Sequence, residues 1–256
     1  SCDGRMHPGR QQDGLRGFVG APRFRLAQSP DAVVAACARA LASPRLLPTQ
    51  TLRRAHLLRA RAAAHLRLGR PDAALQDLKE AEAAASAIAG DRFFQRSMGV
   101  SFQLLRAIAL VQSGDTAAAL PFARAAMEAR PYALEVQQVA ASVLQLVRSG
   151  DGSSPSPWLQ MVRLDPDAGA TALIKEAEAG NFTGVLDLRK KIEPAWPAER
   201  LKPFALAVRE GAGAQFLSAV IVSLHVAYAR AATGDADGAQ RELANVRTHV
   251  DAALRA

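Results

Sequence analysis

The amino-acid sequence predicts an all-α protein built as a succession of antiparallel helix hairpins. Alanine is 55 of the 256 residues, and aromatic residues are only 5% of the chain. Sandwiches and barrels favour β-branched and aromatic residues, whereas alanine is the best helix former and lets helices approach closely. Glycine, often followed by Asp or Asn, recurs with proline between Ala/Leu-rich stretches. These are the residues at which helices end and start again.

Helix signals repeat along the chain. Ser29-Pro30-Asp31 predicts the start of a first helix, which Pro44 ends. The Val/Ile/Leu cluster at 217–226 belongs to a helix, because its stretch is too long and Ala-rich for a strand. We expect helices over 30–43, 51–68 and 71–90, then up to residues 113, 130 and 149, over 158–164, up to 179 and 192, over 214–233, and from 236 to the C-terminus.

Composition divides the chain into three parts. Residues 1–28 are rich in Gly, Pro and Arg and show no helical period, which predicts a disordered or loosely attached arm. We do not expect these residues to be an intact signal peptide, because they contain no apolar core region. The sequence GSSPSP at 152–157 is the clearest internal loop. We therefore expect helical repeats over 29–151 and degenerate repeats over 152–256 that continue the same array. No apolar run approaches the roughly 20 residues of a transmembrane helix.

Positive charge is concentrated at the start of the chain. The net charge is +8, but residues 1–70 hold 13 Arg and 3 Asp, a balance of +10, which leaves −2 for the rest. Residues 45–70 contain seven Arg and no acidic residue. This pattern raises nucleic acid, anionic lipid or an acidic protein as partners.

A shared pattern follows the glycines. Small or apolar residues recur 5, 9 and 12 positions after each one, which places them on one face of the following helix. We expect the glycine to form a tight turn and this face to pack against the preceding helix. The residues at these offsets are Ala74, Leu78 and Ala81 after Gly69, Ala119, Ala123 and Ala126 after Gly114, Val185, Arg189 and Ile192 after Gly180, and Ala239, Leu243 and Val246 after Gly234.

Residues 66–84 (LRLGRPDAALQDLKEAEAA) and 111–131 (VQSGDTAAALPFARAAMEARP) resemble tetratricopeptide (TPR) repeats. The resemblance implies an α-solenoid of helix hairpins in a right-handed superhelix. The repeats are irregular, and Arg61-Ala62 and Arg106-Ala107 stand where the family has Leu-Gly. A generic Ala-rich helical bundle is the alternative fold.

Residues 29–78 are similar to the first repeat of small exported proteobacterial TPR proteins, on the helix residues Val34 to Cys37. This similarity implies a periplasmic or secreted protein, with a cytoplasmic location as the alternative. In that group the helix cysteine often pairs with one upstream, which here is Cys2. Either Cys2 and Cys37 form a disulfide, or Cys37 is a buried small hydrophobe and Cys2 is free.

Catalytic patterns are absent from the sequence. The five His residues show no metal-ligand spacing with Cys or carboxylates, and Gly-Ala-Gly at 211–213 follows no strand, so no phosphate loop is predicted. We therefore expect a protein that is not an enzyme, with no metal and no cofactor.

The TPR resemblance implies that the first helix of each hairpin lines a concave groove for a partner. Ala63 and Leu105 replace the asparagines of the family's carboxylate clamp, so binding of chaperone tails is not supported. Alternatively, Arg53, Arg54, Arg59, Arg61 and Arg67 form a solvated face. The implied groove residues are His56, Arg59 and Arg67 at a basic end and, further on, Ser101, Leu104, Ile108, Val111, Ile221, Leu224 and Tyr228.

Two functions are compatible with this reading. The first is a non-catalytic scaffold that binds a peptide or protein segment, with acidic residues at one end and apolar anchors behind. The alternative is an intracellular nucleic-acid-associated or regulatory protein that uses the Arg-rich residues 1–70. That region has only Phe18 and Phe24 as interleaved aromatics and no helix-turn-helix signature, which makes nucleic acid the weaker prediction.

Overall fold

The computed structural model describes residues 29–147, 156–165, 168–192 and 213–255, and no strand occurs in these ranges. The prediction of an all-α protein is confirmed for this part of the chain, including the helix through the apolar cluster at 217–226. The predicted arm at 1–28 and the predicted division at 151/152 lie outside the described residues. No described helix is both long and apolar enough to cross a bilayer.

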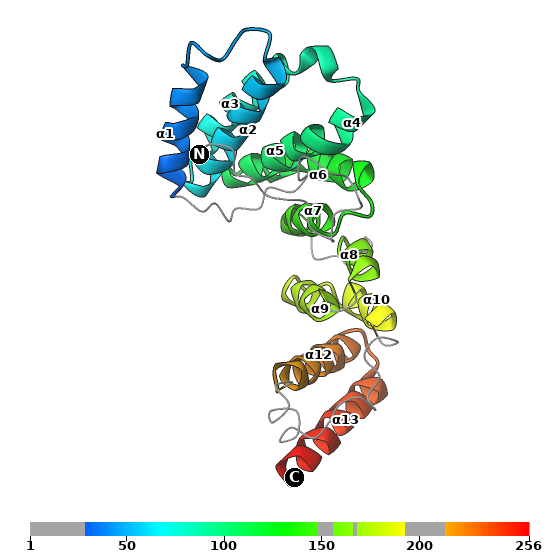
Figure 1. Ribbon diagram of the computed structural model, residues 1–256. Coiled ribbons are helices and arrows are strands. Elements are labelled where there is room, and N and C mark those ends of the chain that lie inside the picture. The colour runs from blue at the N-terminus through cyan, green and yellow to red at the C-terminus, as the bar shows by residue number, and fades with distance from the viewer. Residues whose placement is uncertain (1–28, 148–155, 166–167, 193–212, 256) are drawn as a thin grey trace. The chain divides into compact units, whose positions relative to one another are not determined.

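The chain separates into two compact units, Ser1–Val147 and Arg148–Ala256 (Figure 1). In the first unit, α4, a π-helical turn and α5 follow one another without a break. The described elements of this unit are α1 (Pro30–Leu41), α2 (Thr51–Arg67), α3 (Pro71–Ala84), a 3₁₀ turn (Ser86–Ile88), α4 (Arg92–Phe94), the π turn (Gln95–Gly99), α5 (Val100–Gln112), α6 (Thr116–Ala129) and α7 (Leu134–Val147).

The second unit contains five described helices. Within it, α9 packs on α10 and α12 on α13, and α12 also contacts α9 and α10. The helices are α8 (Leu159–Leu164), α9 (Gly169–Glu178), α10 (Phe182–Ile192), α12 (Gly213–Ala232) and α13 (Ala236–Arg255).

Small residues line the helix contacts of the first unit, as their spacing predicts. The predicted residues Ala74, Leu78 and Ala81 of α3 have no exposed surface, and the same holds for the three alanines of α6. In the second unit the pattern is less complete, because Leu243 on α13 is half-exposed.

Each of the four hairpin turns has the same backbone geometry. The glycines Gly69, Gly114, Gly180 and Gly234 have φ between 65° and 88°, the left-handed region. In every turn the glycine N–H donates to the carbonyl three residues earlier, and the next N–H donates to the carbonyl five residues before it. This is the Schellman ending, which satisfies the last carbonyls of a helix. The predicted glycine turn is therefore confirmed at all four positions.

The residue after the glycine begins the next helix. The Oδ1 atoms of Asp115, Asn181 and Asp235 accept hydrogen bonds from the N–H groups three residues later, at 3.2, 3.2 and 2.8 Å. After Gly69 this position is Arg70, and Pro71 at the first helical position replaces the side-chain cap. Only three residues thus separate the two helices of each hairpin, which makes the two helices antiparallel neighbours.

The turn between α9 and α10 has an additional anchor. Glu176 is fully buried, and its two carboxylate oxygens accept hydrogen bonds from Ser156 Oγ, at 2.6 Å, and from Asn181 Nδ2. Gly184 is small enough to lie against Asn181, where a Cβ atom would collide with the amide. Glu176 therefore ties the segment before α8 to the cap of α10.

The glycine geometry yields a stability prediction. Replacing Gly114 by Ala forces a Cβ atom into the left-handed region and should lower the free energy of unfolding by about 1–2 kcal/mol. Urea unfolding followed by circular dichroism measures this change.

Gly90→Ala is the matched control, because Gly90 is exposed, does not have a positive φ, and an added Cβ would meet nothing within 4 Å. This variant should stay within about 0.5 kcal/mol of the parent protein. Equal losses in the two variants would mean that the turn conformation does not stabilise the hairpin.

Candidate functional site

The first helices of the two hairpins in unit 1 run in the same direction. Arg59 Nη1 donates to Ser101 Oγ at 2.9 Å, and Gln112 Nε2 donates to the carbonyl of Leu66 at 3.3 Å. The earlier residue of α2, Arg59, contacts the start of α5, and the later one, Leu66, contacts its end. The two helices α2 and α5 therefore run parallel. The expected groove residues of unit 1 come from these two helices.

The basic residues expected at one end of the groove lie in different environments. Arg67 is exposed at the end of α2, and His56 is half-buried. Arg59 retains some exposed surface, but its Nε atom is buried and burial lowers the pKa of its guanidinium to about 10. It is still charged at neutral pH, and it contacts the neighbouring helix rather than facing solvent along its whole length.

The apolar residues expected next to them are mostly part of the core. Leu104 has no exposed surface and lies in a cluster with α6 and α7, so it is not available to a partner. Ile108 and Val111 are half-buried and pack against the same cluster. The physical reason is the position of α5, which contacts α2, α3, α6 and α7 and so has most of its circumference covered.

The residues expected in unit 2 form an exposed apolar stripe. Ile221, Leu224 and Tyr228 are 41%, 44% and 63% exposed on one side of α12, whereas Val222 and Val226 are buried on the other. The ring of Tyr228 meets the ring of Phe182 edge to face, with centroids 5.3 Å apart. Within the described residues of this unit, these three large apolar side chains are exposed on one side of α12.

A charged cluster between α2 and α3 was not expected from the sequence. Arg61 makes a two-pronged contact with Asp77, with Nε at 2.9 Å from Oδ2 and Nη2 at 2.5 Å from Oδ1. Asp77 is buried, and His65 Nε2 lies 3.8 Å from it. The hydrogen bond to Asp77 raises the pKa of Arg61, so this guanidinium is held charged inside the hairpin. The interpretation of Arg59 and Arg61 as part of a solvated arginine face is therefore wrong, although Arg53, Arg54 and Arg67 are exposed.

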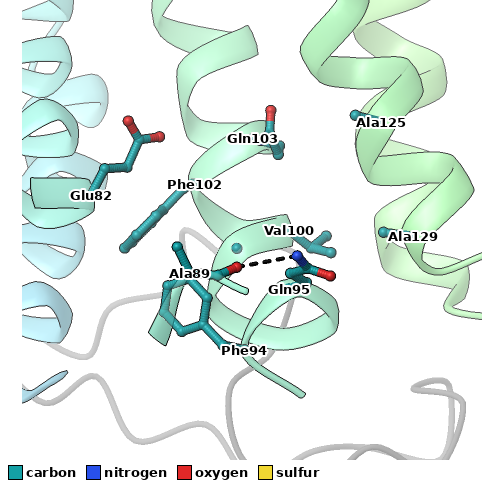
Figure 2. A pocket seen from close by; sticks show the side chains of 10 residues that line it. Glu82, Ala89, Phe94, Gln95, Val100, Phe102, Gln103, Ala125 and Ala129 are labelled. Carbon is teal, nitrogen blue, oxygen red and sulfur yellow. Dashed lines mark hydrogen bonds between the residues drawn. The ribbon is translucent and has the colours of Figure 1, made fainter. Parts of the chain in front are cut away.

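An open pocket of about 470 Å³ lies between the two hairpins of unit 1. Phe94 and Phe102 form part of its wall, with ring centroids 6.0 Å apart, and Gln95 donates to the carbonyl of Ala89 beside them (Figure 2). The π-helical turn forms another part of the wall, and such turns are frequent at functional sites. The lining residues are Glu82, Ala89, Phe94, Gln95, Gly99, Val100, Phe102, Gln103, Ala125 and Ala129.

The sequence contains a weak signal for this pocket. Phe93, Phe94 and Phe102 are three of only nine phenylalanines in the chain, gathered within ten residues. The π turn itself has no comparable signal. A Cβ atom on Gly99 would lie 3.2 Å from the carbonyl oxygen of Phe94, which indicates a tight turn at this point.

Cys37 is fully buried among Val33, Leu57 and Ala64, in the core between α1 and α2. Its expected partner Cys2 lies outside the described residues, so the disulfide stays a prediction. Among the residues that the structure describes, no three His, Cys, Asp or Glu side chains gather as ligands of a metal ion.

The Arg61–Asp77 contact yields a prediction for a double-mutant cycle. Arg61→Met should lower the free energy of unfolding by about 3 kcal/mol, because it leaves the buried carboxylate of Asp77 without its main partner. The double variant Arg61→Met/Asp77→Leu should recover most of this loss, measured by urea unfolding. Equal losses in the single and double variants would show that packing, not the buried charge, determines the effect.

His65 yields a pH prediction. Burial is the larger cause that lowers the pKa of His65 below 6.5, with Arg61 and Arg70 adding to the shift and Asp77 opposing it. The unfolded chain therefore binds a proton at His65 more readily than the folded chain does. The free energy of unfolding falls as the pH decreases through 6.5 and towards the lower pKa of the folded state.

His65→Gln should reduce that loss in urea unfolding between about pH 7.5 and 5.5. An unchanged pH dependence in this variant would contradict the assignment.

No known protein-family model matches the chain, and no curated protein is significantly similar to it in sequence.

Proposed function

We propose that this chain is a non-catalytic scaffold of the TPR type, which binds a peptide or protein segment along the first helices of its hairpins. The observation that carries the proposal is the apolar stripe of Ile221, Leu224 and Tyr228. Large apolar side chains spaced by three and four residues on an exposed helix face fit the anchors of a bound peptide or amphipathic helix.

Three features of the hairpins support the solenoid reading. The four turns share one backbone geometry, and buried alanines form the helix contacts within the hairpins of unit 1. In addition, α2 and α5 run parallel, as successive first helices do in repeat arrays. The similarity of residues 29–78 to exported repeat proteins extends the proposal to the periplasm or the cell surface. A leader sequence ahead of Ser1 in the coding sequence would support that location.

Fewer residues are available to contact a peptide than the sequence implies. Arg67 and His56 supply basic groups on α2, while Arg59 donates to Ser101 and Leu104 lies in the core. We therefore assign the basic contacts to Arg67 and His56 and the main apolar contacts to α12. Acidic residues of a partner complement the first set, and apolar anchors complement the second.

The alternative of nucleic-acid binding loses part of its basis. Of the seven arginines in 45–70, Arg59 donates to Ser101, Arg61 pairs with Asp77, and Arg70 lies 3.8 Å from Asp31. These groups have intramolecular partners that compete with phosphate. A binding constant for DNA or RNA that falls steeply with salt would favour this alternative over the scaffold.

Selection of peptides from a displayed random library on the intact chain tests the proposal. The selected peptides should combine acidic with apolar residues, and Leu224→Ser/Tyr228→Ser should weaken their binding at least about tenfold through lost apolar burial. Arg67→Glu should weaken the binding of acidic peptides specifically. Isothermal titration with the synthesised peptides measures both effects.

Leu243→Ser is the matched control, because Leu243 on α13 is 48% exposed, close to the 44% of Leu224, but lies on another helix. Its peptide affinity should equal that of the parent chain. Peptides that bind equally well to the stripe variant and to the parent would overturn the proposed contact surface.

A further inference from the structure

The connections of unit 1 fall on two opposite edges. Because α2 and α5 run parallel, the segments that precede them lie at one end of the unit, and the turns at Gly69 and Gly114 lie at the other. The α1–α2 and α3–α4 connections are both at the top of Figure 1. The end of α6 belongs to the same edge, since Ala125 and Ala129 line the pocket together with Phe94 and Gln95. We call the edge formed by these three connections the loop edge.

Exposed large apolar side chains gather on the loop edge. Five such side chains occur among the described residues of unit 1, and Leu47, Leu52, Phe93 and Tyr132 belong to the loop edge. The fifth, Leu146, lies near the other end of α7. Leu47, Phe93 and Tyr132 are each more than half exposed, at 54%, 56% and 66%. Each of the three connections thus presents at least one large apolar side chain to solvent.

Hydrogen bonds fix the backbone at Leu47 and Phe93. The Leu47 N–H donates to Gln50 Oε1 and the Gln50 N–H donates to the Leu47 carbonyl, both at 3.0 Å. The neighbouring Leu46 packs inward on the α1–α2 core. Ser97 Oγ donates to the Phe93 carbonyl at 2.6 Å, while the next residue, Phe94, is buried. Leu47 and Phe93 are therefore exposed in connections whose backbone is fixed by hydrogen bonds.

Positive charge accompanies the apolar side chains. Arg45, Arg54 and Arg92 are exposed on the same connections or in the first turn of the following helix, and no ion pair engages them within the described residues. No acidic residue occurs between Asp31 and Asp72. The carboxylate beside Phe93 is Asp91, whose Oδ1 accepts the Phe94 N–H at 2.8 Å. The α1–α2 and α3–α4 connections of the loop edge are therefore basic as well as apolar, whereas the end of α6 carries the exposed carboxylate of Glu128.

The combination discriminates between classes of partner. Nucleic acid uses the arginines but offers no environment for isolated leucines at a phosphate backbone. A folded protein needs a contiguous complementary surface, whereas these apolar groups come from three separate connections. The interface of an anionic bilayer accepts single apolar side chains at any lateral spacing and attracts Arg to its headgroups.

We propose that the loop edge of unit 1 docks on the surface of a bilayer that contains anionic phospholipid. Leu47, Phe93 and Tyr132 enter the interfacial region, and Arg45, Arg54 and Arg92 contact the phosphate headgroups. The proposal does not rest on the peptide-binding function, because its residues lie neither on α12 nor among the groove residues of α2.

Flotation of the intact chain with lipid vesicles tests the proposal. The chain should bind vesicles in which about a third of the lipid is phosphatidylglycerol, but not vesicles of phosphatidylcholine alone. Arg45→Gln/Arg54→Gln/Arg92→Gln should lower the partition coefficient about 100-fold, at about fivefold for each arginine. Leu47→Ser/Phe93→Ser should lower it about tenfold or more. Rising salt should weaken binding of the parent chain.

Matched variants from the rest of unit 1 serve as controls. Arg67→Gln/Arg124→Gln and Leu146→Ser change exposed residues away from the loop edge and should bind as the parent does. Phe93→Trp adds a direct readout, since its fluorescence should shift to the blue with anionic vesicles and stay unchanged with neutral ones. Circular dichroism of each variant verifies that the helices are intact.

Three results would overturn the proposal. The first is no binding to anionic vesicles, and the second is equal loss in the control and loop-edge variants. The third is binding of single-stranded or duplex nucleic acid that depends on Arg45, Arg54 and Arg92 but not on Leu47 and Phe93. Loss of vesicle binding in the loop-edge variants with unchanged peptide binding would separate this surface from the proposed scaffold function.

Discussion

The rest of the structure depends on the left-handed glycine that joins the two helices of a hairpin. At Gly69, Gly114, Gly180 and Gly234 it lets the last carbonyls of one helix find donors within two residues. At three of these turns the next side chain caps the following helix. A turn this short leaves the chain no freedom in direction, so the second helix must fold back on the first. The small residues that follow the glycine then face the helix they pack on.

Packing through alanine has consequences for the rest of the surface. Ala119, Ala123 and Ala126 of α6 are fully buried, which brings α6 close to its neighbours and covers much of α5. Little apolar surface is then left exposed along the middle of α5. Larger side chains find room at the ends of the hairpins or on helices with fewer neighbours. Among the described residues, most of the exposed large apolar side chains lie on the loop edge of unit 1 or in the apolar stripe of α12, and Leu146 and Leu243 lie elsewhere.

The candidate site was predictable only in part. The sequence and the TPR resemblance identify Ile221, Leu224 and Tyr228, which are exposed, but also Leu104, which lies in the core. Periodicity defines which residues share a helix face, but not how many neighbouring helices cover that face. The contacts of Arg61 and Arg59 on α2 could not be predicted either, because their partners Asp77 and Ser101 are 16 and 42 residues away in the sequence. The π turn beside Phe94 has no residue pattern of its own.

The sequence by itself determined the helical class, the positions of the turns and the concentration of positive charge in residues 1–70. These properties are local, since glycine, proline and Asx residues act on the backbone next to them and alanine acts through helix propensity and small size. Tertiary structure alone decided which charges are neutralised and which apolar groups reach solvent. Both depend on what lies across a helix contact, and residues far apart in the chain meet there only after the hairpins have folded.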